Sequence, residues 1–156
     1  MAETALAVRH ATPADLPALL DLYQHLNPGD ARPDSAAAQA ILARLLAFEG
    51  SQIFLGHADG LLATSCTLVV IPNLTQGGQP YALIENVVTT PLFRRRGLDR
   101  LLLDAAAAAA WDCGCYKVML LTGRSDRGTL AFYAAAGFEQ TKTGFQKRHP
   151  STRPTP

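Results

Sequence analysis

The sequence lacks the features that define several large classes of protein. Residues 61–82 carry no charge, but Pro72 and Pro80 break them, and no stretch approaches the roughly 20 apolar residues of a membrane helix. The three cysteines are an odd set without metal-ligand spacing, so we expect free thiols packed as small apolar side chains and no bound metal. Because the first residues show no basic stretch before an apolar core, we expect no signal peptide and a cytoplasmic protein.

Three motifs of nucleotide and ester chemistry are also missing. The sequence has no G-x-G-x-x-G, which disfavours a Rossmann dinucleotide site, and no G-K-[ST], which excludes a Walker A loop. Without G-x-S-x-G, covalent hydrolase chemistry has no support. The four histidines have no common spacing, so we expect them to be structural.

The sequence does have an uneven distribution of charge. The net charge is +1, but residues 1–90 hold 3 basic and 8 acidic side chains, whereas residues 91–156 hold 11 basic and 5 acidic ones. Four arginines, Arg94, Arg95, Arg96 and Arg100, fall within seven positions. This asymmetry predicts that the second half binds an anion, and nucleic acid and a polyphosphate ligand are both open at this point.

The order of apolar patterns predicts one α/β (α+β) domain. We expect a mixed, twisted central sheet of about six to seven strands, flanked by about four helices, over residues 1–149. Residues 150–156 are rich in proline, and we expect a disordered tail there. The predicted strands are 6–11, 52–57, 61–71, 81–90, 116–121 and 138–147, and the predicted helices are 12–26, 34–50, 98–111 and 125–136.

The most informative segment is a strand at 81–90, a basic loop at 91–97 and a helix that begins at Leu98. The start of a helix has backbone N–H groups without intrahelical partners and a partial positive charge, so it binds phosphate readily. Gly97 allows the backbone to approach an anion or to adopt positive φ, and the arginines add bidentate donors. The alternative is a solvated basic turn without a ligand.

This segment resembles a known family. Arg94-Arg95-Arg96-Gly97-Leu98-Asp99 resembles the Q/R-x-x-G-x-G/A signature of the GNAT superfamily of N-acetyltransferases. Residues 87–93 resemble the family's strand and the start of its loop, and residues 132–138 (FYAAAGF) resemble its FYxxxGF segment. The resemblance covers roughly residues 5–148. Asp99 departs from it, because it places a carboxylate where glycine or alanine is usual.

The resemblance implies acetyl-CoA as co-substrate. Backbone amides of Arg95 to Arg100 would hold the pyrophosphate, and the strand edge would pair with the pantetheine amides while one N–H polarises the thioester carbonyl. Asp126 would contact the pantetheine arm, and Tyr133 would protonate the leaving thiolate. The implied coenzyme-binding set is Val87, Val88, Thr89, Arg94, Arg95, Arg96, Gly97, Leu98, Asp99, Arg100 and Asp126.

Two residues are predicted to act in catalysis. Tyr133 is suited to be a general acid, since a phenol has a pKa near 10, but it could equally pack on the sheet. Glu85 lies two residues before Val87, so we expect the two side chains to share a face. A buried carboxylate on a central strand is costly unless it is functional or paired, so Glu85 is the predicted base or amine-orienting group, with a salt bridge as the alternative.

The acceptor is less clearly indicated. Residues 114–117 (GCYK) and 83–86 (LIEN) are similar to segments of glucosamine-6-phosphate N-acetyltransferases, a likeness that implies a possible homodimer. Lys117, Arg124 and Arg127 are candidate cations for a sugar phosphate, or ordinary surface charges. We therefore expect a small-molecule amine acceptor, with a protein or peptide N-acetyltransferase and a non-catalytic ligand-sensing or nucleic-acid-binding domain as alternatives. Since only Phe93 stands beside the arginines, we expect no nucleic-acid partner and no membrane partner.

Overall fold

A computed structural model describes residues 5–150 of the chain. The α/β fold with a mixed sheet and four α-helices is confirmed, although the described residues form five strands and not six or seven. The proposed disordered tail lies largely outside the described range. The elements are β1 (Ala7–His10), α1 (Leu16–Tyr23), α2 (Ser35–Leu46), β2 (Gln52–Ala58), β3 (Leu61–Ile71), β4 (Tyr81–Thr89), α3 (Leu98–Asp112), β5 (Val118–Leu120) and α4 (Arg127–Ala135).

The five strands follow one another across a single sheet in chain order. Strands β1 to β4 are antiparallel neighbours, and β5 pairs parallel to β4. A parallel pair needs a crossover connection, and α3 provides it between β4 and β5. The chain divides into two compact units, Met1–Leu120 with the whole sheet and Leu121–Pro156 with α4.

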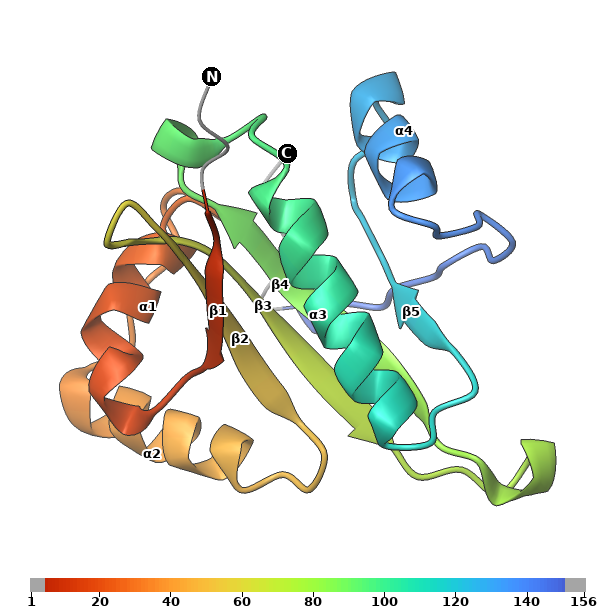
Figure 1. The fold of residues 1–156 in the computed structure, drawn as a ribbon. Coiled ribbons are helices and arrows are strands. Elements are labelled where there is room, and N and C mark those ends of the chain that lie inside the picture. The colour runs from red at the N-terminus through yellow and green to blue at the C-terminus, as the bar shows by residue number, and fades with distance from the viewer. Residues whose placement is uncertain (1–4, 151–156) are drawn as a thin grey trace. The chain divides into compact units, whose positions relative to one another are not determined.

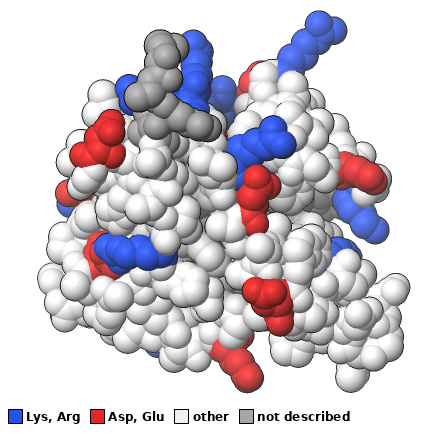
Figure 2. Space-filling model, viewed as in Figure 1, with Lys and Arg blue, Asp and Glu red and all other residues white. Residues whose placement is uncertain are grey.

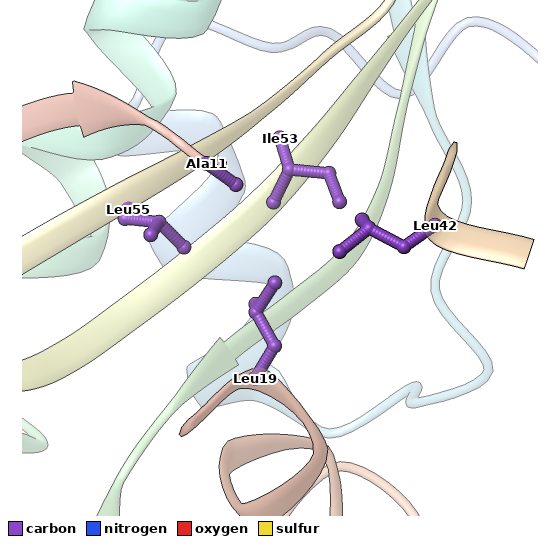
Figure 3. Close-up of a cluster of buried hydrophobic side chains, with 5 residues drawn as sticks. All are labelled: Ala11, Leu19, Leu42, Ile53 and Leu55. Atoms are coloured by element: carbon purple, nitrogen blue, oxygen red, sulfur yellow. The ribbon is translucent and has the colours of Figure 1, made fainter. Parts of the chain in front are cut away.

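In the first unit, α3 covers one face of the sheet, and α1 and α2 cover the other (Figure 1). The core under α1 and α2 is formed by Leu19, Leu42, Ile53 and Leu55, whose side chains point toward one another (Figure 3). Ile53 and Leu55 are two residues apart on β2, so they share a face. This packing anchors α1 against the middle of the sheet.

Short-range signals set several element boundaries. Asp34 caps α2 and accepts a hydrogen bond from the N–H of Ala37 at 2.9 Å. Between β2 and β3, Asp59 (φ 52°) and Gly60 (φ 77°) both adopt the left-handed conformation that a tight hairpin requires. Both features agree with the elements predicted from the sequence.

The predicted last strand at 138–147 is wrong. These residues form no strand and are almost all exposed. The N–H of Thr141 donates to the carbonyl of Glu139 two residues earlier, a tight turn that extended backbone excludes. A strand needs a neighbouring strand for its backbone N–H and C=O groups, and within the described residues no strand pairs with this segment.

The cysteines are free thiols, as predicted, but they are not all packed inside. Cys66 and Cys115 are buried, whereas Cys113 is exposed. Burial raises the pKa of the Cys66 thiol to about 12. In the part of the chain that the structure describes, no helix is both long and apolar enough to span a bilayer.

Candidate active site

Strand β4 parts from β5 halfway along its length. The pairing joins only Ala82–Ile84 to Val118–Leu120, and β5 ends there. Over residues 85–89 no strand of the first unit, as described, covers this edge of β4. The backbone groups on this edge can therefore pair with an extended ligand, as an added strand would.

A β-bulge in the pairing of β3 with β4 lies near the point where β4 parts from β5. Ser65 pairs with Val88 and Thr67 pairs with Glu85, so two steps on β3 match three on β4. Within this bulge Asn86 has φ 52°, a conformation that asparagine tolerates better than most residues. The extra residue moves the side chains that follow it on β4 to the opposite face of the sheet. The faces predicted for Glu85, Val87 and Val88 from regular alternation therefore change.

Hydrogen bonds hold the last residues of β4 in place. The Thr64 hydroxyl donates to the carbonyl of Val88 at 2.9 Å, and the Thr89 hydroxyl donates to Thr64 Oγ1 at 2.9 Å. Arg94 Nε then donates to the carbonyl of Thr89 at 3.1 Å. These three bonds tie the strand end to β3 and to the loop that follows.

The loop before α3 presents a row of open backbone donors. Among the described residues, no acceptor meets the N–H groups of Arg95, Arg96 or Gly97. Leu98 and Asp99 open the helix, so their N–H groups have no intrahelical acceptor either. Gly97 caps the helix with φ 75°, and a Cβ built there would meet nothing within 4 Å. Such a row of donors at a helix start suits a phosphate or diphosphate.

The arginines surround this row, but they are not equally free. Arg94 uses Nε for the Thr89 carbonyl, and the Arg96 guanidinium lies 5.0 Å from the ring centre of Phe93. Arg95 adopts φ 61°, a left-handed conformation that costs energy for a residue with a Cβ. Figure 2 shows Lys and Arg side chains at the upper end of the view, where Figure 1 places the start of α3. The loop therefore combines backbone donors with positive charge.

The Asp99 carboxylate occupies one of the backbone N–H groups at the start of α3. Its Oδ1 accepts a hydrogen bond from the N–H of Arg100 at 3.0 Å. Its carboxylate forms no ion pair with a neighbouring arginine among residues 5–150. Since the carboxylate takes up the Arg100 amide, the amides that remain open run from Arg95 to Asp99.

Replacing Asp99 with Ala is expected to tighten the binding of coenzyme A. The change removes a negative charge beside the proposed diphosphate and frees the Arg100 N–H, and each charge-assisted contact is worth about 1.5–3 kcal/mol. We expect the dissociation constant to fall about tenfold in calorimetric titration, with a small loss of melting temperature because an acidic side chain favours a helix start. Asp104→Ala, lower on the same helix, is the control; equal affinities in all three proteins would contradict the prediction.

The prediction that Glu85 is buried is wrong. Its side chain is exposed, and because of the bulge it shares a face with Val88 and not with Val87. This is the face that packs against α1, since Ser65 and Thr67 lie beside Tyr23 of α1. Because Glu85 is exposed, the cost of burying a carboxylate no longer supports a functional role for it. The exposed side chain is accessible to an amine that approaches on the α1 side.

An open pocket lies on that same side of the sheet, between α1 and the end of β4. It is lined by Ala18, Asp21, Leu22, His25, Leu61, Leu62, Thr90, Leu92 and Phe93. The Asp21 carboxylate on its rim is paired with Arg32, and Thr90 immediately follows β4. A ligand in this pocket would reach β4 from the face opposite α3.

The two predicted residues of the second unit lie on α4. Asp126 caps this helix and accepts hydrogen bonds at 3.0 Å from the N–H of Thr129 and from Arg124 Nε. The Thr129 N–H, the Thr129 hydroxyl and then Arg124 lower the pKa of Asp126. The Tyr133 ring packs edge-on against Phe132 and Phe138, at centroid distances of 5.1 and 6.2 Å. The proposed pantetheine contact and acid role stay predictions.

Two of the three candidate cations for a sugar phosphate, Lys117 and Arg124, contact other side chains. The Lys117 ammonium lies 5.2 Å from the ring centres of both Tyr81 and Tyr116. The Lys117 carbonyl accepts from the N–H of Ala82, six residues and about 20 Å along β4 from Val88. Arg124 forms an ion pair with Asp126. Lys117 is therefore at the wrong end of β4 to contact a ligand at Val88.

The residues present fit acetyl-CoA. The open amides at 95–99 match a diphosphate, and the uncovered edge of β4 matches an extended chain of amides. No group of three or more His, Cys, Asp or Glu residues within the described range could hold a metal ion. Sequence reasoning missed the bulge at Asn86, although asparagine inside a run of β-branched residues is a signal for one.

Comparison with known proteins identifies the family. The pattern of the acetyltransferase (GNAT) family matches residues 16–138. Glucosamine 6-phosphate N-acetyltransferase of Trypanosoma brucei brucei is 32% identical over 135 residues, 85% of this chain and 88% of that protein. Aminoglycoside N(6')-acetyltransferase type 1 of Stenotrophomonas maltophilia is 28% identical over 144 residues, 91% of this chain and 92% of that protein.

A solved structure extends the match. A candidate acetyltransferase from Agrobacterium tumefaciens str. C58 superimposes with a TM-score of 0.87 at 48% identity, over 92% of this chain and 99% of that one. The similarity therefore spans the sheet, the arginine loop and α4 alike. With the open amides before α3 and the uncovered edge of β4, these matches show that the chain belongs to the GNAT family and is an acetyl-CoA-dependent N-acetyltransferase.

Proposed function

We propose that this chain transfers the acetyl group of acetyl-CoA to a primary amine of a small molecule, by direct attack in a ternary complex, and that amino sugars are the first acceptors to test. Two of its relatives carry names that refer to amino-sugar substrates, glucosamine 6-phosphate and aminoglycosides. The row of open amides before α3 carries the proposal, because it provides a diphosphate site next to an uncovered strand edge.

Each part of the first unit has a distinct task in this reaction. The amides of residues 95–99 bind the diphosphate, and the edge of β4 at Val87 to Thr89 orients the thioester. Acetyl-CoA supplies the acetyl group and a thiolate as leaving group. The acceptor amine approaches from the α1 side, where Glu85 and the pocket beside Thr90 lie. A C–N bond forms as the C–S bond breaks, and the proton lost by the amine balances the one that the thiolate takes up.

A panel of amines tests the proposal. Purified protein is incubated with acetyl-CoA and glucosamine, glucosamine 6-phosphate, aminoglycosides, polyamines or short peptides, and released thiol is measured. Turnover on a small amine supports the proposal, whereas turnover on peptides alone would favour a peptide N-acetyltransferase. A rise in melting temperature with acetyl-CoA but no turnover on any amine would favour a sensing domain.

Glu85→Gln is expected to lower activity, with the largest effect at low pH. The amide keeps the size of the side chain but cannot accept a proton, and at low pH more of the amine is protonated and needs a base. The ratio of wild-type to variant kcat/KM should therefore grow as pH falls from 9 to 6. Glu49→Gln, another surface glutamate, is the control. A ratio that stays flat across this range would exclude proton removal by Glu85.

The homodimer implied by the resemblance remains a proposal. Sedimentation velocity at several protein concentrations tests it directly, because the mass in solution distinguishes one chain from two.

A further inference from the structure

Two buried hydroxyl groups lie in the middle of β3. Ser65 and Thr67 are 0% and 3% exposed, and within residues 5–150 Ser65 Oγ and Thr67 Oγ1 make no hydrogen bond of standard length and angle, although the Tyr23 hydroxyl lies beside both. Leaving a buried polar group unsatisfied costs about 1–3 kcal/mol, while an apolar side chain of the same shape costs nothing comparable. Two such groups on one core strand therefore call for an explanation beyond packing.

Their place on the strand is specific. Ser65 pairs with Val88 and Thr67 pairs with Glu85, so the two hydroxyl-bearing residues bracket the bulge of β4. Being two residues apart, they share one face of the sheet. Val88 and Glu85 lie on that face too. The Ser65 hydroxyl is therefore next to Val88, in the strand end proposed to orient the thioester, and the Thr67 hydroxyl is next to Glu85, the proposed base.

The third hydroxyl comes from α1. Tyr23, the last residue of α1, packs against the core of Leu19, Ile53 and Leu55, and its hydroxyl lies beside those of Thr67 and Ser65. Burial raises the pKa of Tyr23, so its phenol stays protonated near neutral pH. Tyr23 is only partly buried, whereas Ser65 and Thr67 lie beneath it. Of the three, Tyr23 is therefore the one that a ligand on the α1 side can touch.

The Tyr23 hydroxyl can make a hydrogen bond to β3 and still bind a ligand. A phenol has one proton to donate and can accept hydrogen bonds at its oxygen. If Tyr23 donates to one of the two buried hydroxyls, its oxygen remains able to accept a hydrogen bond from a ligand N–H or O–H. The buried pair can thus orient the phenol of Tyr23, a residue of α1 that is only partly buried.

We propose that Tyr23 contacts the acceptor and accepts a hydrogen bond from its nitrogen or an adjacent hydroxyl, and that Ser65 and Thr67 are positioning residues for the Tyr23 hydroxyl. The inference rests on the proposed function, because it names the residues that bind the acceptor in that reaction. It assigns the hydroxyls of β3 to acceptor binding and not to the coenzyme site, which lies at the other edge of β4 and at the start of α3.

Steady-state kinetics of three variants tests the inference. In Tyr23→Phe, Ser65→Ala and Thr67→Val the hydroxyl is removed and the shape is nearly kept. Since one hydrogen bond contributes about 1 kcal/mol, we expect KM for the amine to rise about fivefold in each. KM for acetyl-CoA should not change. The melting temperature of Thr67→Val should stay close to that of the wild type, because valine keeps the shape of the buried side chain.

Two matched variants complete the design. Thr67→Ser keeps the hydroxyl and should keep the wild-type KM for the amine, and Tyr81→Phe, at the far end of β4, should also leave it unchanged. If the wild type acetylates an amine and Tyr23→Phe and Thr67→Val do so with unchanged KM, the inference is overturned while the proposed function stands. If the wild type acetylates no amine of the panel, the proposed function fails, and the inference with it.

Discussion

Replacing Tyr133 with Phe is expected to lower turnover with acetyl-CoA at least tenfold, since a positioned general acid contributes about 10²–10⁴-fold. The phenol would donate a proton to the leaving thiolate, which phenylalanine cannot do. The variant retains the ring contacts with Phe132 and Phe138. Stopped reactions that measure released thiol at saturating acetyl-CoA give the change in kcat.

A second substrate separates an acid role from a packing role. An acetyl thioester with a much more acidic thiol needs no proton at the leaving sulfur, so the deficit of Tyr133→Phe should shrink with it. Tyr116→Phe, which changes a tyrosine beside Lys117, is the control and should turn over normally. An equal deficit with both thioesters, or wild-type turnover with acetyl-CoA, would rule out the acid role.

Replacing Gly97 with Val is expected to weaken the binding of coenzyme A about tenfold, equivalent to about 1.4 kcal/mol. Gly97 has φ 75° and a Cβ there would meet nothing within 4 Å, so the cost comes from the backbone and not from a collision. A β-branched residue resists this conformation, and relaxing it would turn the amides of the loop away from a common target. Calorimetric titration measures the affinity.

Gly114→Val is a matched control for the strain itself. Gly114 follows α3 with φ 78° and equally open surroundings, far from the arginine loop in the sequence. Both variants should lose about 1–2 kcal/mol of unfolding free energy. Only Gly97→Val should lose coenzyme affinity, and Gly97→Asn should recover most of it, because asparagine tolerates positive φ. Equal affinities of the two valine variants would refute the role of the loop amides.

Much of the fold could be predicted from local signals. The bounds of β3 at Leu61–Ile71 and the start of α3 at Leu98 agree with the predictions. Such boundaries depend on neighbouring residues: an Asp-Gly turn, a cap, or a run of apolar side chains. The prediction that the arginine loop leads into a helix start was of this kind, and the open amides at 95–97 agree with it.

The errors concern relations between distant segments. Glu85 and Val87 should share a face if β4 alternates regularly, but one extra residue in the pairing with β3 separates them. The segment 138–147 was predicted to be a strand, yet it turns at Glu139–Thr141. The proximity of Tyr23 to Ser65 and Thr67 was not predicted either, because it depends on how α1 packs on the sheet.

The amino-acid order alone was enough to assign the chain to its family and to locate the proposed coenzyme loop, since helix starts and glycine conformations are local properties. Only the folded chain decided which side chains meet at the acceptor side of β4. A bulge is a mismatch between two strands, and its effect on every later side chain appears only when the register between them is known.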